Sequence, residues 1–155
     1  MGPKMISPSQ QETQHPPLHA ESLEAAARLA FAEHVRLYDE QDQIIVRAER
    51  HELRLVYLSI RASRQSSSAT FIRCGVDSEL RQMWINSLQV SDALRRQGVG
   101  REMVEATEAT ARAVGISSVK VYPLVDAAAF WETLGYTADT SRSRVLHKEM
   151  TFDVS

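Results

Sequence analysis

Cysteine and long apolar runs are scarce in this chain of 155 residues. The single cysteine, Cys74, excludes an internal disulfide framework, and we expect a buried thiol in a protein of a reducing compartment. The sequence has no run of about 18 apolar residues and does not open with a charged and then apolar signal, so it predicts no membrane span and a cytoplasmic location. The net charge of −2 argues against a general binder of nucleic acid.

Proline is rare outside the N-terminal segment. Four of the five prolines lie within residues 1–19, among serine, glutamine and few large apolar residues. Such a segment cannot bury enough apolar surface to offset its ordering entropy, so we predict a flexible polar tail over 1–19. An alternative reading of this tail is the export signal of a secreted bacterial effector. Residues 20–155 have an ordinary globular composition and are predicted to form a single domain.

The first half of this domain has the pattern of one helix and four strands. Residues 22–38 carry an apolar stripe at helical spacing, and Ser22 suits the N-cap of that helix. Strand-like segments follow at 44–48, 53–60, 69–76 and 81–90, with Gly75 as a candidate bulge. Short connections between consecutive strands favour an antiparallel meander.

The second half alternates helices and strands. Helices are predicted at 101–114, which Gly115 would end, and at 127–134, with a strand at 119–122 between them and another after Gly135. This order requires some parallel pairing. We therefore predict an α/β fold with a mixed, mostly antiparallel central sheet of about six or seven strands, flanked by helices.

The segment between the 81–90 strand and the 101–114 helix is the most informative part of the chain. Gly98 and Gly100 allow the backbone to come close to a ligand, and the helix start presents unpaired N–H groups, while Arg95 and Arg96 add positive charge. This combination favours an anion cradle, most often for phosphate. Met103 stands where a dinucleotide fingerprint needs its third glycine, and the Gly-Lys-Ser/Thr of a P-loop is absent.

Two other interpretations of this segment stay open. A glycine-broken loop that binds nothing would show the same residues. A DNA-binding helix-turn-helix would use the same arginines on phosphates, but the strands on both sides of the segment argue against it.

A second motif lies downstream, where residues 127–136 read Ala-Ala-Ala-Phe-Trp-Glu-Thr-Leu-Gly-Tyr. Arg-x-x-Gly-x-Gly after a strand, followed about thirty residues later by this segment, resembles the GNAT family of N-acetyltransferases. The resemblance covers about residues 80 to 150 and implies an acyl-CoA N-acyltransferase fold that binds acetyl-coenzyme A. The residues that it assigns to coenzyme A are Gln89 and Val90 on the strand, Arg95, Arg96, Gln97, Gly98, Val99, Gly100 and Arg101 in the loop and helix start, and Phe130 and Trp131 in the second motif.

The chain departs from the family at four places. Family members usually carry two helices between the first and second strands, whereas the single early helix predicted here precedes all the strands. Trp131 stands at the position of the family's tyrosine acid, Leu124 at that of an asparagine, and Trp84 at that of a glutamate. Because an indole has no ionisable proton at working pH, another group must protonate the leaving thiolate. The alternative for Trp131 and Trp84 is that they only pack in the core or the pocket and have no chemical role.

Substitute groups for the chemistry exist. An amine arrives protonated at neutral pH and must lose a proton before it attacks the thioester. We take Tyr122 as the candidate acid and Glu79, with Asp77 beside it, as the candidate base, and His147 as a further base. The predicted function is acetyl transfer to an amine of a small molecule or protein by direct attack, without a metal, a nucleic acid or a membrane partner. A homodimer is compatible with the sequence, and the alternative function is a non-catalytic CoA-binding or protein-interaction module.

Overall fold

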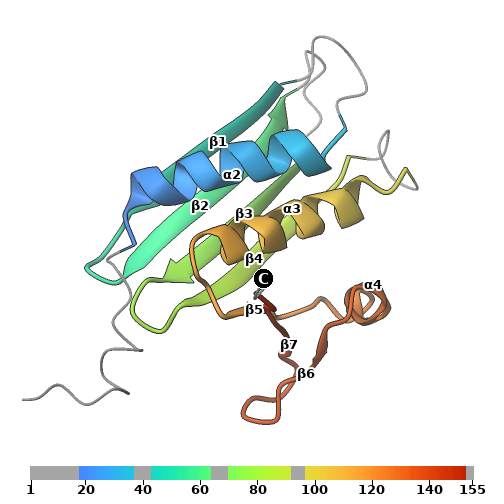
Figure 1. Ribbon diagram of the computed structural model, residues 1–155. Helices are drawn as coiled ribbons and strands as arrows, with labels where there is room; N and C mark the ends of the chain where they lie inside the picture. Colours follow the sequence, from blue (N-terminus) through green and yellow to red (C-terminus); the bar gives the residue numbers. More distant parts are fainter. Residues whose placement is uncertain (1–17, 37–42, 64–69, 92–96, 153–155) are drawn as a thin grey trace, which may run out of the picture.

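The computed structural model describes residues 18–36, 43–63, 70–91 and 97–152. Figure 1 shows two long helices lying side by side across a large sheet, with a shorter helix beside the C-terminal strands. The elements in chain order are α2 (Ala20–His34), β1 (Gln43–Arg50), β2 (Leu55–Ser63), β3 (Thr70–Asp77), β4 (Gln82–Gln89), α3 (Val99–Ala113), β5 (Ser118–Val121), α4 (Ala128–Thr133), β6 (Thr137–Ala138) and β7 (Leu146–Glu149).

The strands form one sheet of seven in the order β1-β2-β3-β4-β5-β7-β6. The first four pair antiparallel with their neighbours, β4 and β5 pair parallel, and β7 pairs antiparallel with both β5 and β6. The predicted mixed, mostly antiparallel α/β sheet is therefore confirmed. The parallel pair arises because α3 returns the chain from the end of β4 to the start of β5.

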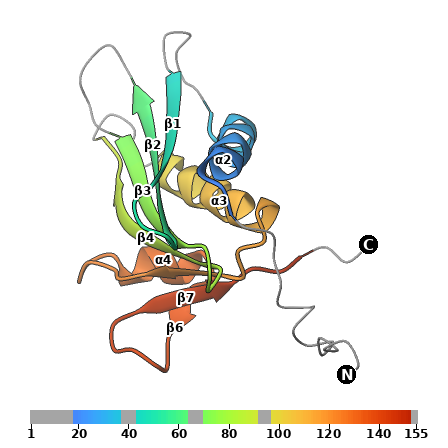
Figure 2. The same ribbon diagram turned by 90° about the vertical axis from the view of Figure 1, so that its left-hand side faces the viewer.

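The core lies on one face of this sheet, under α2 and α3 (Figure 2). Alternate side chains of the strands point into it, so that Leu58 on β2, Ile72 and Cys74 on β3 and Met83 on β4 are buried. Burial raises the pKa of the Cys74 thiol to about 12, so this cysteine is an uncharged core residue. The other face of β1–β4 carries the intervening residues, and Figure 2 shows it uncovered by α2 and α3.

The domain begins earlier than predicted. Leu18 is only 4% exposed and belongs to the core, and the Arg50 guanidinium donates a hydrogen bond to its carbonyl oxygen at 2.5 Å. His19 is the N-cap of α2, so the expectation that Ser22 caps this helix is wrong. The predicted tail, residues 1–19, therefore includes one residue that packs on the core, because Leu18 directly precedes the N-cap of α2.

The predicted bulge is misplaced by a short distance. Gly75 pairs in register with Trp84, whereas the register shifts between Arg73 and Cys74. Arg73 pairs with Ser87 and Cys74 with Ile85, so the extra residue is Asn86 on β4. Bulges bend a strand and increase its twist, and this one lies where β4 begins to leave β5.

The order of the first elements agrees with the expected departure from the family. Among the described residues, α2 is the helix that precedes the sheet, and a tight turn joins β1 directly to β2. In that turn the His51 N–H donates to the Leu55 carbonyl oxygen at 2.9 Å. No helix therefore separates these two strands.

Candidate active site

The site lies where β4 loses its neighbour. The parallel ladder between β4 and β5 ends at the pair Ile85–Val121, although β4 continues to Gln89. On the other side, Pro123 follows β5 and leads the chain away. The gap holds a cavity of about 740 Å³, a volume typical of small-molecule sites. Its lining residues come from β4 and the segment after it, from α3, and from the segment between β5 and α4: Ile85, Asn86, Ser87, Leu88, Val90, Gly100, Val121, Tyr122, Pro123, Leu124, Asp126, Ala127, Phe130 and Trp131.

The glycine turn closes one end of the cavity. Gly98 is the N-cap of α3 with φ +79° and provides no side-chain cap, so the first N–H groups of the helix are left for a ligand. Gly100 lies close under the cavity wall, since a Cβ there would come within 3.5 Å of Val90 Cγ2 and 3.6 Å of Phe130 Cζ. Any longer side chain would enter the cavity. The turn therefore has the geometry of an anion cradle.

The remaining loop residues divide between backbone and side-chain roles. Val99 is a core residue, so only its backbone faces a ligand at this position. Arg101 is exposed and forms an ion pair with Glu105 at 3.4 Å, one helical turn away. Gln97 is exposed beside the turn. Arg95 and Arg96 lie outside the described residues.

The aromatic residues of the second motif form a wall of the cavity. Phe130 and Trp131 meet edge to face, with ring centroids 5.2 Å apart, and Trp131 meets Tyr136 in the same way. Trp131 is buried and also lines the cavity, so its position is that of a packing residue with one face toward the ligand. Gln89, by contrast, is exposed on β4, pairs with Phe71 and is not among the lining residues.

Among the described residues that line the cavity, Tyr122 is the one that carries a phenol. It follows the last residue of β5 and lies at the point where the strands separate, with 59% of its side chain exposed. Asn86 and Ser87 line the cavity from β4, and Asp126 lines it from the segment before α4. Sequence reasoning missed these three polar residues, and for Asn86 the reason is that the bulge that turns it outward leaves no signature in the local pattern.

The structure does not bring Glu79 to this cavity. Glu79 lies in the turn before β4, and the cavity begins beyond the middle of that strand of eight residues, about 10 Å or more along its axis. Its carboxylate is 3.5 Å from Arg54, which also pairs with Asp77 at 2.8 Å. The oxygen Oδ1 of Asp77 accepts the N–H groups of Glu79 and Leu80, so these acids organise a turn. His147 pairs with Glu149 on β7 and is also outside the lining.

A buried polar cluster ties the cavity wall to α3. Tyr136 donates its hydroxyl hydrogen bond to Glu108 Oε2 at 2.9 Å, and Lys148 Nζ donates to Glu108 Oε1 at 3.0 Å and to the Leu134 carbonyl oxygen at 2.8 Å. Burial, followed by the adjacent Glu108, raises the pKa of Tyr136 far above its ordinary value. This phenol therefore remains protonated and structural, and it holds the rings of Trp131 and Phe130 in place.

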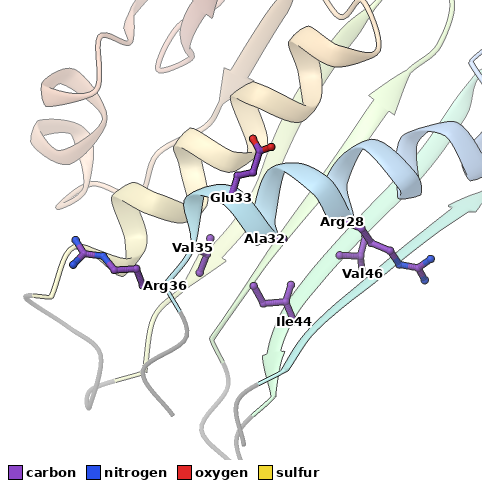
Figure 3. A pocket seen from close by; sticks show the side chains of 7 residues that line it. All are labelled: Arg28, Ala32, Glu33, Val35, Arg36, Ile44 and Val46. Carbon is purple, nitrogen blue, oxygen red and sulfur yellow. The ribbon is translucent and has the colours of Figure 1, made fainter. Parts of the chain in front are cut away.

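A second hollow, of about 510 Å³, lies between α2 and the edge strand β1 (Figure 3). Ile44 and Val46 form its base under the helix, with Arg28 and Arg36 at its two ends. Arg36 pairs with Glu102 of α3 at 3.2 Å. The described lining residues of this hollow come from the C-terminal half of α2, the two residues after it and β1, and include no helix N-terminus that could hold an anion, so we assign the active site to the gap between β4 and β5.

A strand edge, an adjacent helix N-terminus and an aromatic wall surround one cavity, and this arrangement suits a ligand that carries phosphate. The sequence profile of the acetyltransferase (GNAT) family matches residues 20–136. The chain therefore belongs to this family. It is an N-acetyltransferase by class.

Solved structures of low identity share the fold. GCN5 of Tetrahymena gives a TM-score of 0.55 at 12% identity, covering 63% of this chain and 71% of that chain. The ribosomal-protein-S18-alanine N-acetyltransferase of Escherichia coli gives 0.51 at 16% identity, covering 89% and 94%. The PaiA N-acetyltransferase of Thermoplasma acidophilum, in complex with coenzyme A, gives 0.50 at 14% identity, covering 60% of each chain. A comparison with curated proteins finds no match. Within the described residues, no helix is both long and apolar enough to span a bilayer.

Proposed function

We propose that this protein transfers the acetyl group of acetyl-coenzyme A directly to an amine held at the Tyr122 end of the cavity. The observation that carries the proposal is the gap beyond the pair Ile85–Val121, which joins the glycine turn at Gly100 to polar side chains at the other end. A cosubstrate with a pyrophosphate at one end and a thioester at the other fits this order of groups.

The glycine turn and the strand edge would hold the cosubstrate. The N–H groups at the start of α3 suit the pyrophosphate, and the turn leaves room because Gly100 has no side chain. From Asn86 to Gln89, β4 has no β5 partner, so its backbone groups on that side can pair with the amides of the pantetheine arm. The same edge supplies N–H donors for the oxyanion of the tetrahedral intermediate.

The chemistry needs one proton removed and one supplied. The amine nitrogen attacks the carbonyl carbon of the thioester, the C–S bond breaks, and the departing thiolate takes a proton. We assign that proton donation to Tyr122, and the support is that Tyr122 is the one phenol among the described lining residues. Asp126, the one carboxylate among the lining residues, is placed to accept the amine proton through water, in the role that the sequence assigned to Glu79.

The proposal is tested by thiol release from acetyl-coenzyme A with a panel of peptides, polyamines and aminoglycosides. We expect turnover by the native protein. Tyr122→Phe should lower kcat by about tenfold or more and leave the KM for acetyl-coenzyme A within twofold, because a lost acid affects the chemical step. Trp131→Tyr, which restores the family residue on the facing wall, is the paired variant and should raise kcat.

Two outcomes would overturn parts of this proposal. Normal turnover by Tyr122→Phe would remove the assigned acid but keep the activity. Tight binding of coenzyme A with no acetylation of any amine on the panel would favour the alternative function, a module that keeps the cofactor site without catalysis.

A further inference from the structure

We propose that the acceptor is an amine with an anionic group close to it, recognised by Arg73 and Arg142 on the sheet face that α2 and α3 leave uncovered. The inference rests on the proposed function and adds the chemical class of the acceptor. An amino acid and the N-terminus of an acidic peptide share this chemistry, and the experiment below separates them.

Arg73 lies directly beside the reacting end of the cavity. It pairs in register with Ser87, one of the lining residues, and projects from the uncovered face of β3. Its guanidinium carbon lies 4.4 Å from the centre of the Phe71 ring. A guanidinium held against an aromatic face keeps its N–H groups directed outward for a carboxylate.

Arg142 lies over a residue of the same sheet face, Trp84 on β4. It belongs to the connection between β6 and β7, and its guanidinium carbon lies 5.6 Å from the centre of the Trp84 ring. Trp84 pairs with Gly75 on β3, two residues along that strand from Arg73, so Trp84 and Arg73 lie on the same face of the sheet. Lys120 lies over the same ring at 5.7 Å, but its ammonium already pairs with Asp139 at 3.2 Å.

These two arginines lack carboxylate partners within the described part of the chain. The ion pairs there involve other basic residues, and neither Arg73 nor Arg142 takes part in one. Both are exposed and held on rings, so an anion would meet preorganised donors.

The charges around the opening are divided in a way that fits one kind of acceptor. Asp126 lies on the side of β5 and α4 and favours a cationic amine, whereas Arg73 and Arg142 lie on the sides of β3 and the β6–β7 connection and favour an anion. A polycation such as a polyamine would meet two arginines in this position. An amine with a neighbouring carboxylate complements both sides.

The test compares matched acceptors. The peptide arm uses the C-terminal amides of Ser-Glu-Glu and Ser-Gln-Gln, and the small-molecule arm uses glutamate and glutaminamide. For the native protein we expect kcat/KM about tenfold higher for the acidic member of the preferred pair. Arg73→Gln and Arg142→Gln should each reduce that ratio about threefold or more, with unchanged rates for the neutral member and an unchanged KM for acetyl-coenzyme A.

Arg47→Gln is the matched control, because Arg47 is exposed on the uncovered face but lies on β1, three strands and about 14 Å from β4. The ratio of kcat/KM for the acidic acceptor to kcat/KM for the neutral acceptor should be the same for Arg47→Gln as for the native protein. Raising the salt from about 50 to 500 mM should also lower the acidic preference, since both arginines are open to solvent.

Equal or better rates with the neutral or polycationic amines would overturn the inference while leaving the acetyltransferase function intact. If no amine is acetylated, calorimetry of the same peptides with the protein saturated in coenzyme A decides the matter. Selective binding of the acidic peptide, lost in Arg73→Gln and Arg142→Gln, would support the inference, and equal binding of both peptides would refute it.

Discussion

The two halves of the sheet are built differently, and the active site lies between them. From β1 to β4, neighbouring strands pair over seven or eight residues, and two long helices cover the inner face. In the second half, β5 pairs with β7 over four residues and β6 pairs with β7 over two. Buried polar contacts around Glu108 also hold this half together. The first half is a continuous frame, and the second half is a set of short segments fixed to it through α3.

The difference shows why a cavity forms at this position. β4 belongs to both halves: on one side it follows β3 to its end, and on the other it leaves β5 after the pair Ile85–Val121. The bulge at Asn86 turns β4 at that point, and Pro123 prevents the chain after β5 from continuing the ladder. The unpaired backbone that results would be costly in a closed core, but it becomes useful where a ligand completes the pairing.

The largest expected effect comes from filling the cavity between β4 and β5, at the junction of the two halves of the sheet. Gly100→Glu places a carboxylate against Val90 and Phe130 in the cavity, so we expect affinity for coenzyme A to fall by about 100-fold or more, measured by calorimetry. Gly100→Ala is the control, because its Cβ would lie 3.5 Å from the nearest side-chain atom, an ordinary contact, and alanine favours a helix. Unchanged binding by Gly100→Glu with an intact fold would move the cosubstrate away from this turn.

The second prediction tests whether the first half is an independent frame. Leu18→Ala removes a core side chain next to α2 and should lower the free energy of unfolding by about 2–3 kcal/mol, measured by urea denaturation. Affinity for coenzyme A should stay within twofold, since Leu18 contacts Arg50 at the end of β1, three strands from β4, and is not among the residues that line the cavity. Leu53→Ala, at a side chain that is 93% exposed, should cost less than about 0.5 kcal/mol.

Two N-terminal truncations also test whether Leu18 contributes to the stability of the first half. A chain that starts at Leu18 should keep the native melting temperature, whereas one that starts at Ala20 should lose several degrees. Equal melting temperatures for the two truncations would show that the original boundary at residue 19 was adequate and that the burial of Leu18 contributes little.

Sequence patterns predicted the frame better than the junction. The strands of the first half alternate buried and exposed residues, so their positions follow from periodicity alone, and Gly98 and Gly115 mark both ends of α3. The site residues contributed by the glycine turn and the second motif were also visible, because each has a local signature. These signatures depend on backbone conformation, which the sequence encodes nearby.

The missed features depend on how distant segments meet. Nothing near Asn86 indicates that Arg73 and Cys74 will pair on either side of it, and a bulge at Gly75 was the more obvious expectation. Glu79 precedes the right strand, but only the direction of β4 shows that it lies at the wrong end for Tyr122. Glu108 is a charged residue of α3, and it is buried because Tyr136 and Lys148, from segments 28 and 40 residues later, donate hydrogen bonds to it.

The third prediction concerns the polar contacts of the second half. Tyr136→Phe keeps the ring against Trp131 but removes one of the donors to buried Glu108, so it should cost about 1–2 kcal/mol of stability. Because the ring remains, affinity for coenzyme A should change by less than about twofold. Tyr57→Phe, at a half-exposed tyrosine of the uncovered face, is the control and should be neutral. A large loss of affinity in Tyr136→Phe would show that the hydrogen bond, rather than ring packing, holds the cavity wall.

The smallest effect is expected at the turn that links β3 to β4, where the frame should be sensitive to acid. Burial alone would raise the pKa of Asp77, but the Arg54 guanidinium and the N–H groups of Leu80 and Glu79 outweigh it and hold that pKa below its ordinary value. A carboxyl group with a lowered pKa in the folded state stabilises the protein above its unfolded pKa, about 3.9, and this contribution disappears as the pH falls through the folded value.

Asp77→Asn should therefore melt below the native protein at pH 7, and the difference in melting temperature should shrink steadily from about pH 5 downward. Glu79→Gln is the control, since its carboxylate is 70% exposed and 3.5 Å from Arg54, and its melting temperature should follow that of the native protein at every pH. A difference between Asp77→Asn and the native protein that is constant down to pH 2.5 would mean that the Asp77 side chain acts through its hydrogen-bonding shape and not through its charge.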